Sequence, residues 1–282
     1  MTATPATAAP GEAAVDGSIR EFAAENGTGS SSGTVTPMIV GGSETTIAKA
    51  PYMVQLFYLD SADTLWFCNG ALIAPNKVLT AAQCVDGRTL TNRDKAVVLG
   101  GTATWADLDH SIRIGIKRQW VHPSYSPSGV AHDLAVLTLN GTLPYTPARV
   151  ALGSDSVLYQ PGVEATVYGW GVTGTARGQS GESGALKEAA LPVQADSTCD
   201  TALRTALGGQ DAFVESVMTC AGRPAGADDT TTTTPCMSDA GAPLVVSGRI
   251  VGVFSWASST ARSGAGWRAP IPCSPGPAPM PG

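Results

Sequence analysis

Short apolar segments separated by turn residues recur along most of this chain. Between residues 39 and 257, stretches containing Gly, Pro, Asn or Asp alternate with apolar runs at 53–59, 66–73, 96–99, 134–139, 164–168, 186–193, 244–246 and 250–255. Residues 111–120 alternate strictly, with Ile112, Ile114 and Ile116 on one face, as a half-buried strand does. Many short strands joined by turns are typical of an antiparallel barrel or sandwich. The pattern therefore predicts an all-β protein.

Composition narrows the class further. Charged residues make up only 14% of the chain, and it contains 33 Gly and 20 Pro, which argues against a helical bundle or coiled coil. The 43% of hydrophobic residues is enough to fill a sizeable core. A net charge of −6 does not favour phosphate binding, and no run of 18 apolar residues occurs. We therefore expect neither a nucleic acid nor a membrane as partner.

The two ends of the chain differ from its middle. Residues 1–38 are rich in Ala, Thr, Ser, Gly and Pro without periodicity, which predicts a flexible leader or pro-segment. Residues 258–282 form a Pro- and Gly-rich tail that we expect to be irregular. One helix is predicted at about 197–207, where Asp196 or Ser197 caps its start and Gly208-Gly209 ends it. The folded domain is thus expected at 39–257.

Cysteine and histidine usage bears on compartment and cofactors. The six cysteines include no Cys-x-x-Cys pair, so they indicate disulfides and an oxidising compartment. We expect a secreted protein, although the start of the chain lacks the basic and apolar regions of a signal peptide. The histidines, His110, His122 and His132, are not expected to cluster, and His132 should point away from the side chain of Asp133. We therefore expect no metal site and no cofactor.

Several segments, in order along the chain, carry a family resemblance. They are Ile-Val-Gly-Gly at 39–42, the Cys-bounded segment 68–84, His-Asp-Leu-Ala-Val-Leu-Thr-Leu at 132–139, Tyr-Gly-Trp-Gly at 168–171, Cys-Met-Ser-Asp-Ala-Gly-Ala-Pro-Leu at 236–244 and Ser-Trp at 255–256. Together they resemble the chymotrypsin/trypsin family of serine peptidases. The resemblance implies two six-stranded antiparallel Greek-key barrels, at about 39–150 and 151–257, with a cleft between them. The family's last strand and C-terminal helix have no recognisable counterpart after Ala257.

The catalytic residues depart from that family. Its mechanism needs a hydroxyl nucleophile, an imidazole base and a carboxylate that orients the imidazole. By resemblance, Gln83 stands at the histidine position and Ala240 at the serine position, and only Asp133 matches. An amide is no base near neutral pH, and a methyl group is no nucleophile. The sequence therefore predicts a proteolytically inactive protein.

Further positions follow from the same resemblance. The oxyanion hole would be formed at Ser238 and Ala240, and Ser238 and Ala242 replace glycines of the family. The specificity pocket would be lined at Thr234, Ser255 and Ala257.

The resemblance also implies an activation pair and a set of disulfides. Ile39 would pair with Asp239, although Met38 rather than a basic residue precedes Ile39. The implied disulfides are Cys68–Cys84, Cys199–Cys220 and Cys236–Cys273.

Three hypotheses for function follow. The first is a non-catalytic homologue that binds a protein or carbohydrate through the former cleft. The second is a secreted trypsin-like endopeptidase that hydrolyses peptide bonds by chemistry the sequence does not display. The third is a decayed product without function. Fold alone does not name the ligand.

Overall fold

A computed structural model describes residues 10–26, 42–86, 92–129, 131–171, 184–206, 213–222 and 239–256. Its strands are β1 (Ser43–Glu44), β2 (Met53–Leu59), β3 (Leu65–Ala74), β4 (Lys77–Thr80), β5 (Ala96–Gly100), β6 (Ile112–Val121), β7 (Ala135–Leu139), β8 (Arg149–Val150), β9 (Glu164–Gly169), β10 (Lys187–Pro192), β11 (Pro243–Val246) and β12 (Arg249–Val253). The helices are α1 (Pro10–Asn26) and α2 (Asp196–Ala206), with 3-10 turns η1 (Ala82–Cys84), η2 (Arg93–Lys95), η3 (Trp105–His110) and η4 (Gly153–Tyr159).

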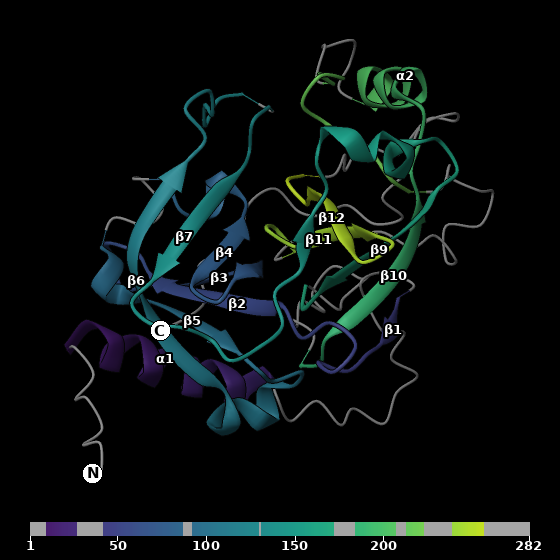
Figure 1. The fold of residues 1–282 in the computed structure, drawn as a ribbon. Helices are drawn as coiled ribbons and strands as arrows, with labels where there is room; N and C mark the ends of the chain where they lie inside the picture. The colour runs from purple at the N-terminus through teal and green to yellow at the C-terminus, as the bar shows by residue number, and fades with distance from the viewer. Residues whose placement is uncertain are drawn as a thin grey trace.

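The first half of the chain forms a closed barrel. Its strands follow the order β2-β3-β4-β7-β6-β5, and every pairing is antiparallel. β2 is buried along its whole length, because it lies between β3 and β5 (Figure 1). In β6, Ile116 is buried, and Ile112 and Ile114 pack against the same cluster, as their alternation predicts. The predicted antiparallel β architecture is confirmed for this half.

The second half contributes a six-stranded sheet. Its order is β1-β10-β9-β11-β12-β8, and its pairings are antiparallel except for the two-residue parallel pairing of β12 with β8. Strand β1 precedes the barrel strands in the chain and β8 follows them, and both pair with this sheet. One buried cluster contains Phe57 and Phe67 from the barrel together with Tyr168 and Val245 from this sheet. The two halves therefore share a core, and the fold matches the expected double-barrel type.

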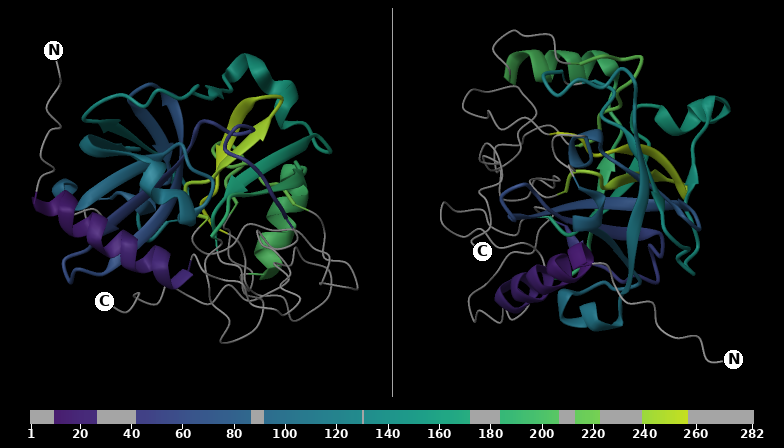
Figure 2. Two further views of the ribbon diagram at one scale, coloured as in Figure 1. Left: turned by 90° about the horizontal axis from the view of Figure 1, so that it is seen from below. Right: turned by 90° about the vertical axis from the view of Figure 1, so that its left-hand side faces the viewer.

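One of the two described α-helices was predicted from the sequence and the other was not. α2 agrees with the helix expected at about 197–207. α1 was not predicted, and the expectation of a flexible leader does not hold for Pro10–Asn26, whose helix lies along the outside of the first barrel in both views of Figure 2. Among residues 13–21, whose burial is described, the buried side chains of α1 are Val15 and Ile19. With Phe22 they follow the i, i+4, i+7 spacing of an apolar helix face, a short pattern within an Ala-, Ser- and Gly-rich leader. Neither helix of the described residues combines the length and the apolar character that a membrane crossing needs.

Two of the three expected disulfides lie in the described residues. Cys68 on β3 bonds Cys84 in η1, and Cys199 on α2 bonds Cys220. Both pairings agree with the resemblance. The third, between Cys236 and Cys273, lies outside the described residues.

Candidate active-site region

Gln83 lies on a short turn that is fixed on both sides. The turn η1 follows β4, and its flanking residues Ala82 and Cys84 are buried. The Cys68–Cys84 disulfide ties the turn to β3. Because both neighbours point inward, the Gln83 side chain is left exposed at the barrel end. The sequence therefore places this amide by burying the residues beside it.

Asp133 collects three hydrogen bonds just before β7. Its Oδ1 accepts from the Gln83 backbone N–H at 2.8 Å, and its Oδ2 accepts from Gln83 Nε2 at 2.6 Å and from Ser255 Oγ at 2.5 Å. Hydrogen bonds to a carboxylate are the strong ones in proteins. The hydrogen bonds to this carboxylate therefore come from the backbone and side-chain amides of Gln83 and from the hydroxyl of Ser255.

Gln83 also links the two halves of the molecule. Its Nε2 donates a second hydrogen bond, 2.7 Å long, to the carbonyl of Ser255, which follows β12 of the second sheet. An amide nitrogen carries two N–H donors, so Asp133 and Ser255 together occupy both. The Gln83 side chain thus connects the barrel to the second sheet through these two hydrogen bonds.

Ala240 and Gly241 form a turn that is seated against β3. The Ala240 carbonyl accepts from the Asn69 backbone N–H at 2.8 Å, and the Gly241 N–H donates to the Phe254 carbonyl at 2.9 Å. Gly241 has φ +85°, and a Cβ there would lie less than 3.0 Å from Asn69 O and Thr80 Oγ1. Only glycine fits this close approach without displacing β3. Ala240 packs its methyl group against the core of the barrel.

Asp239 is fully buried beside this turn. Its Oδ1 accepts from the Gly171 N–H at 3.0 Å, and its backbone carbonyl accepts from the Ala242 N–H at 2.9 Å. A Cβ on Gly169 or Gly171 would collide with the Asp239 carboxylate. The glycines of the Tyr-Gly-Trp-Gly segment therefore make room for this buried acid.

The structure brings together part of the predicted site. Gln83, Asp133 and Ser255 are directly hydrogen-bonded, whereas Ala240 is linked to them through β3, whose Asn69 it contacts and whose Cys68 bonds η1. The other predicted positions lie outside the described residues: Ile39, Thr234, Ser238 and Ala257.

One contact between distant residues escaped the sequence interpretation. Ser255 was expected at the specificity pocket, and the structure shows in addition that its hydroxyl donates to Asp133. No sequence signal reports this contact, because 122 positions separate the two residues.

The expectation that the histidines do not cluster is wrong for two of them. His122 and His132 stack with ring centroids 4.7 Å apart. His132 has φ +60° and lies before β7 rather than in a strand, which is why strand alternation misplaced it. Among the described residues, no group of three or more His, Cys, Asp or Glu side chains is arranged to hold a metal ion.

Comparison with known proteins agrees with this architecture. The family model of trypsin matches residues 39–271. A trypsin of Saccharopolyspora erythraea is 35% identical over 226 residues, which cover 80% of this chain and 89% of that protein. Trypsin zeta of Drosophila erecta is 31% identical over 234 residues, covering 79% of this chain and 77% of that protein.

Solved structures share the fold. An inactivated protease paralogue, S-D1, of the scabies mite has a TM-score of 0.64 at 25% identity, with 79% of this chain and 88% of that chain covered. Neuropsin, a serine protease expressed in mouse brain, has a TM-score of 0.59 at 25% identity, with 76% and 86% covered. The fold is thus that of the double-barrel serine peptidases: a closed barrel and a second sheet, joined by the hydrogen bond from Gln83 to Ser255. Within that class, the chain belongs to the trypsin family.

Proposed function

We propose that this chain is a trypsin-family protein without proteolytic activity that acts by binding a protein or a carbohydrate. In this proposal, Gln83, Asp133 and Ala240 occupy the His, Asp and Ser positions of the family's triad. The observation that carries it is the Gln83 amide, whose Nε2 donates to both Asp133 and the Ser255 carbonyl. An amide in this role supplies donors only, and it has no basic lone pair with which to take a proton.

The chemistry of the neighbouring groups supports the same conclusion. Ala240 offers a methyl group where the mechanism needs a hydroxyl. Loss of the serine or the histidine lowers turnover by about 10⁶-fold in a protease that uses the same triad. Ser255 brings a hydroxyl close to Asp133, but the Asp133 carboxylate also accepts two hydrogen bonds from Gln83, so no imidazole stands between the hydroxyl and the carboxylate. The cluster is therefore better suited to holding the two halves together than to proton transfer.

The remaining positions belong to the same proposal. Ser238 with Ala240 would form the former oxyanion hole, and Thr234, Ser255 and Ala257 would line the former specificity pocket. Ile39 and Asp239 would form the activation pair, and the buried Asp239 carboxylate is compatible with that role. The two disulfides indicate an oxidising compartment, which supports secretion.

A secreted endopeptidase is the second candidate. It is favoured by the 35% identity to a protein named trypsin and by the Asp133–Ser255 contact. It would require a nucleophile other than residue 240, for example the hydroxyl of Ser238. The existence of an inactivated protease paralogue with this fold weakens the inference from likeness to activity.

Binding and turnover can be tested on one set of proteins. Wild type, Gln83→Trp and Gln160→Trp would be immobilised and exposed to secreted proteins and glycans from the native source, and bound and cut species would be identified by mass spectrometry. Gln83 and Gln160 are both exposed, so the second variant is a matched control on a different surface. We expect wild type and Gln160→Trp to retain the same uncut ligand and Gln83→Trp to lose it. Cleaved peptides that accumulate with time would favour the endopeptidase, and equal retention by all three would refute binding at this site.

A further inference from the structure

The helix α1 is an addition to the family domain. The family match begins at residue 39, whereas α1 spans Pro10–Asn26. Among its described side chains, Val15 and Ile19 are fully buried, one helical turn apart on one face. They join a buried cluster that also contains Leu99 of β5 and Leu108 of η3, two elements that α1 contacts. The barrel therefore presents a surface that receives one apolar helix face.

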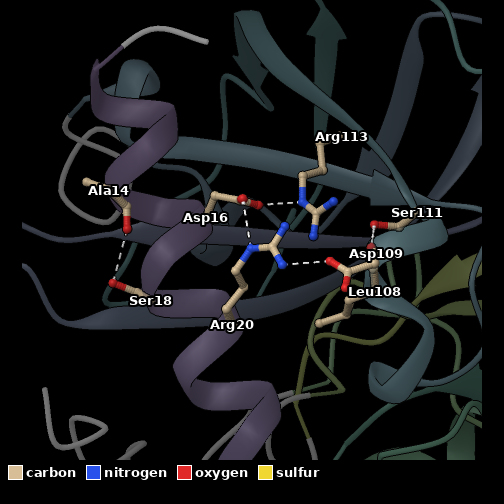
Figure 3. Close-up of polar contacts among 8 residues, drawn as sticks. All are labelled: Ala14, Asp16, Ser18, Arg20, Leu108, Asp109, Ser111 and Arg113. Atoms are coloured by element: carbon tan, nitrogen blue, oxygen red, sulfur yellow. Dashed lines mark hydrogen bonds and ion pairs between the residues drawn. The ribbon is translucent and has the colours of Figure 1, made fainter.

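An ion-pair chain fixes the register of α1 on that surface (Figure 3). Asp16 pairs with Arg113 of β6 at 2.5 Å and with Arg20 at 3.3 Å, and Arg20 pairs with Asp109 of η3 at 2.7 Å. Asp16 and Arg113 are only partly exposed, so their pair is less screened than one fully in water. The surface thus selects a helix with an acidic residue directly after its first buried aliphatic residue.

Other features weaken this docking. Gly17 lies in the middle of α1, where it lowers helix stability. No atom lies within 4 Å of a Cβ placed there, so no close contact requires a glycine at this position. Ser18 hydrogen-bonds back to the Ala14 carbonyl, as helix-weakening serines do. The Asp16–Arg113 contact is an ion pair without hydrogen-bond geometry: Asp16 Oδ1, Arg113 Nε and Arg113 Nη2 are buried with no hydrogen-bond partner among the described residues, which opposes docking. A helix of this length is marginal on its own in water.

Covalent linkage compensates for weak docking. Segment 27–41 joins α1 to the domain, and a short linker gives a docked segment an effective concentration of about 1 mM. At that concentration an interaction with a dissociation constant of about 0.1 mM keeps the site about nine-tenths filled, and the same interaction is largely lost at micromolar protein once the linker is cut.

We propose that the barrel surface beneath α1, formed around Leu99, Leu108, Asp109 and Arg113, is a helix-docking site whose occupant is α1. In the uncut chain α1 covers the site. Cleavage within residues 27–38 releases α1 and opens the site to an amphipathic helix with the same Val-Asp-x-x-Ile pattern. This site is distinct from the Gln83 cluster, and it does not depend on the function proposed for that cluster.

The first test leaves the chain uncut. A fluorescent synthetic peptide of residues 10–26 would be titrated by anisotropy into wild type, Ile19→Asp and Gly17→Ala full-length chains. Since a helix that is docked in cis blocks the site, we expect the peptide to bind Ile19→Asp at least about tenfold more tightly than the other two. A peptide that itself carries Ile19→Asp should bind none of them. Equal binding to all three chains, or none to any, would overturn the proposal.

The second test cuts the linker. A specific protease sequence would be inserted between residues 30 and 31, and the cut chain would be analysed by gel filtration at micromolar concentration. We expect the α1 fragment to separate from a monomeric domain at this concentration. The separated domain should bind the labelled peptide when it is titrated to about 0.1 mM and above. Because the cut protein has the wild-type α1, this test remains decisive if Ile19→Asp fails to fold. Co-elution of the fragment, or a dimer that exchanges α1 between chains, would overturn release from a site covered in cis.

Discussion

The close approach at Gly241 gives a quantitative test of the site's architecture. Replacing Gly241 by Ala adds a Cβ that would lie less than 3.0 Å from Asn69 O and Thr80 Oγ1. Since Asn69 O belongs to the backbone of β3, the turn and the strand must move apart. The move would break both the 2.8 Å bond from Asn69 N–H to the Ala240 carbonyl and the 2.7 Å bond from Thr80 Oγ1 to Asn69 O.

The size of the effect can be worked out from these contacts. A non-glycine residue in the left-handed region costs about 1–2 kcal/mol. Loss of two hydrogen bonds costs about 1–3 kcal/mol more. Gly241→Ala should therefore lower the free energy of unfolding by about 2–5 kcal/mol.

Gly248→Ala provides the matched control. Gly248 has φ +73° in the turn between β11 and β12, and no atom lies within 4 Å of a Cβ placed there. The free energy of unfolding of this variant should fall only by the cost of the left-handed backbone conformation, about 1–2 kcal/mol. Urea denaturation of both variants and wild type measures the difference. Equal destabilisation of the two variants would show that the turn is not seated on β3 as described.

Three further outcomes are expected. Gly17→Ala should increase protection of the α1 amides in hydrogen exchange by about fivefold, the equivalent of about 1 kcal/mol, and unchanged protection would contradict a docked helix weakened by glycine. In Trp66→Phe the pKa of Asp60 should rise in an NMR titration, because the indole N–H bond, 2.8 Å long, is the main cause that holds this pKa below its ordinary value. The stabilisation linked to this carboxylate is present above the unfolded pKa of about 3.9 and is lost as the pH falls through the folded pKa, so the variant should lose less stability in acid. Gln83→His with Ala240→Ser should show no amidase activity, because in the function proposed above Ser238 and Ala242 stand where the family has glycines and Thr234 stands at its specificity position. Strong hydrolysis by this double variant would show a scaffold kept ready for catalysis.

Much of the fold was predictable because strands and disulfides leave local signals. The alternation at Ile112, Ile114 and Ile116 predicts the strand β6. The Cys68–Cys84 disulfide was predicted because the segment between these cysteines resembles a segment of the family. These signals depend on residues close in the chain. They describe elements well and say less about how distant elements meet.

The features that were missed depend on long-range contacts or on sparse patterns. The apolar spacing of Val15, Ile19 and Phe22 predicts a helix at α1, but it is short and lies in a leader whose Ala-, Ser- and Gly-rich composition favours a flexible segment. The Ser255 hydroxyl reaches Asp133 only after the two sheets assemble. The stacking of His132 on His122 depends on a positive φ that nothing in the sequence requires.

The absence of a catalytic nucleophile is the central claim, and an active-site label tests it most directly. The purified chain would be incubated with a fluorophosphonate, beside an active trypsin, and both would be weighed intact by mass spectrometry. We predict a stoichiometric adduct on the active trypsin and none on this chain, because the Ala240 side chain has no oxygen and the Gln83 amide is no base that could activate one. A stoichiometric adduct on any serine of this chain, mapped by peptide sequencing, would contradict the account and identify the protein as a working hydrolase.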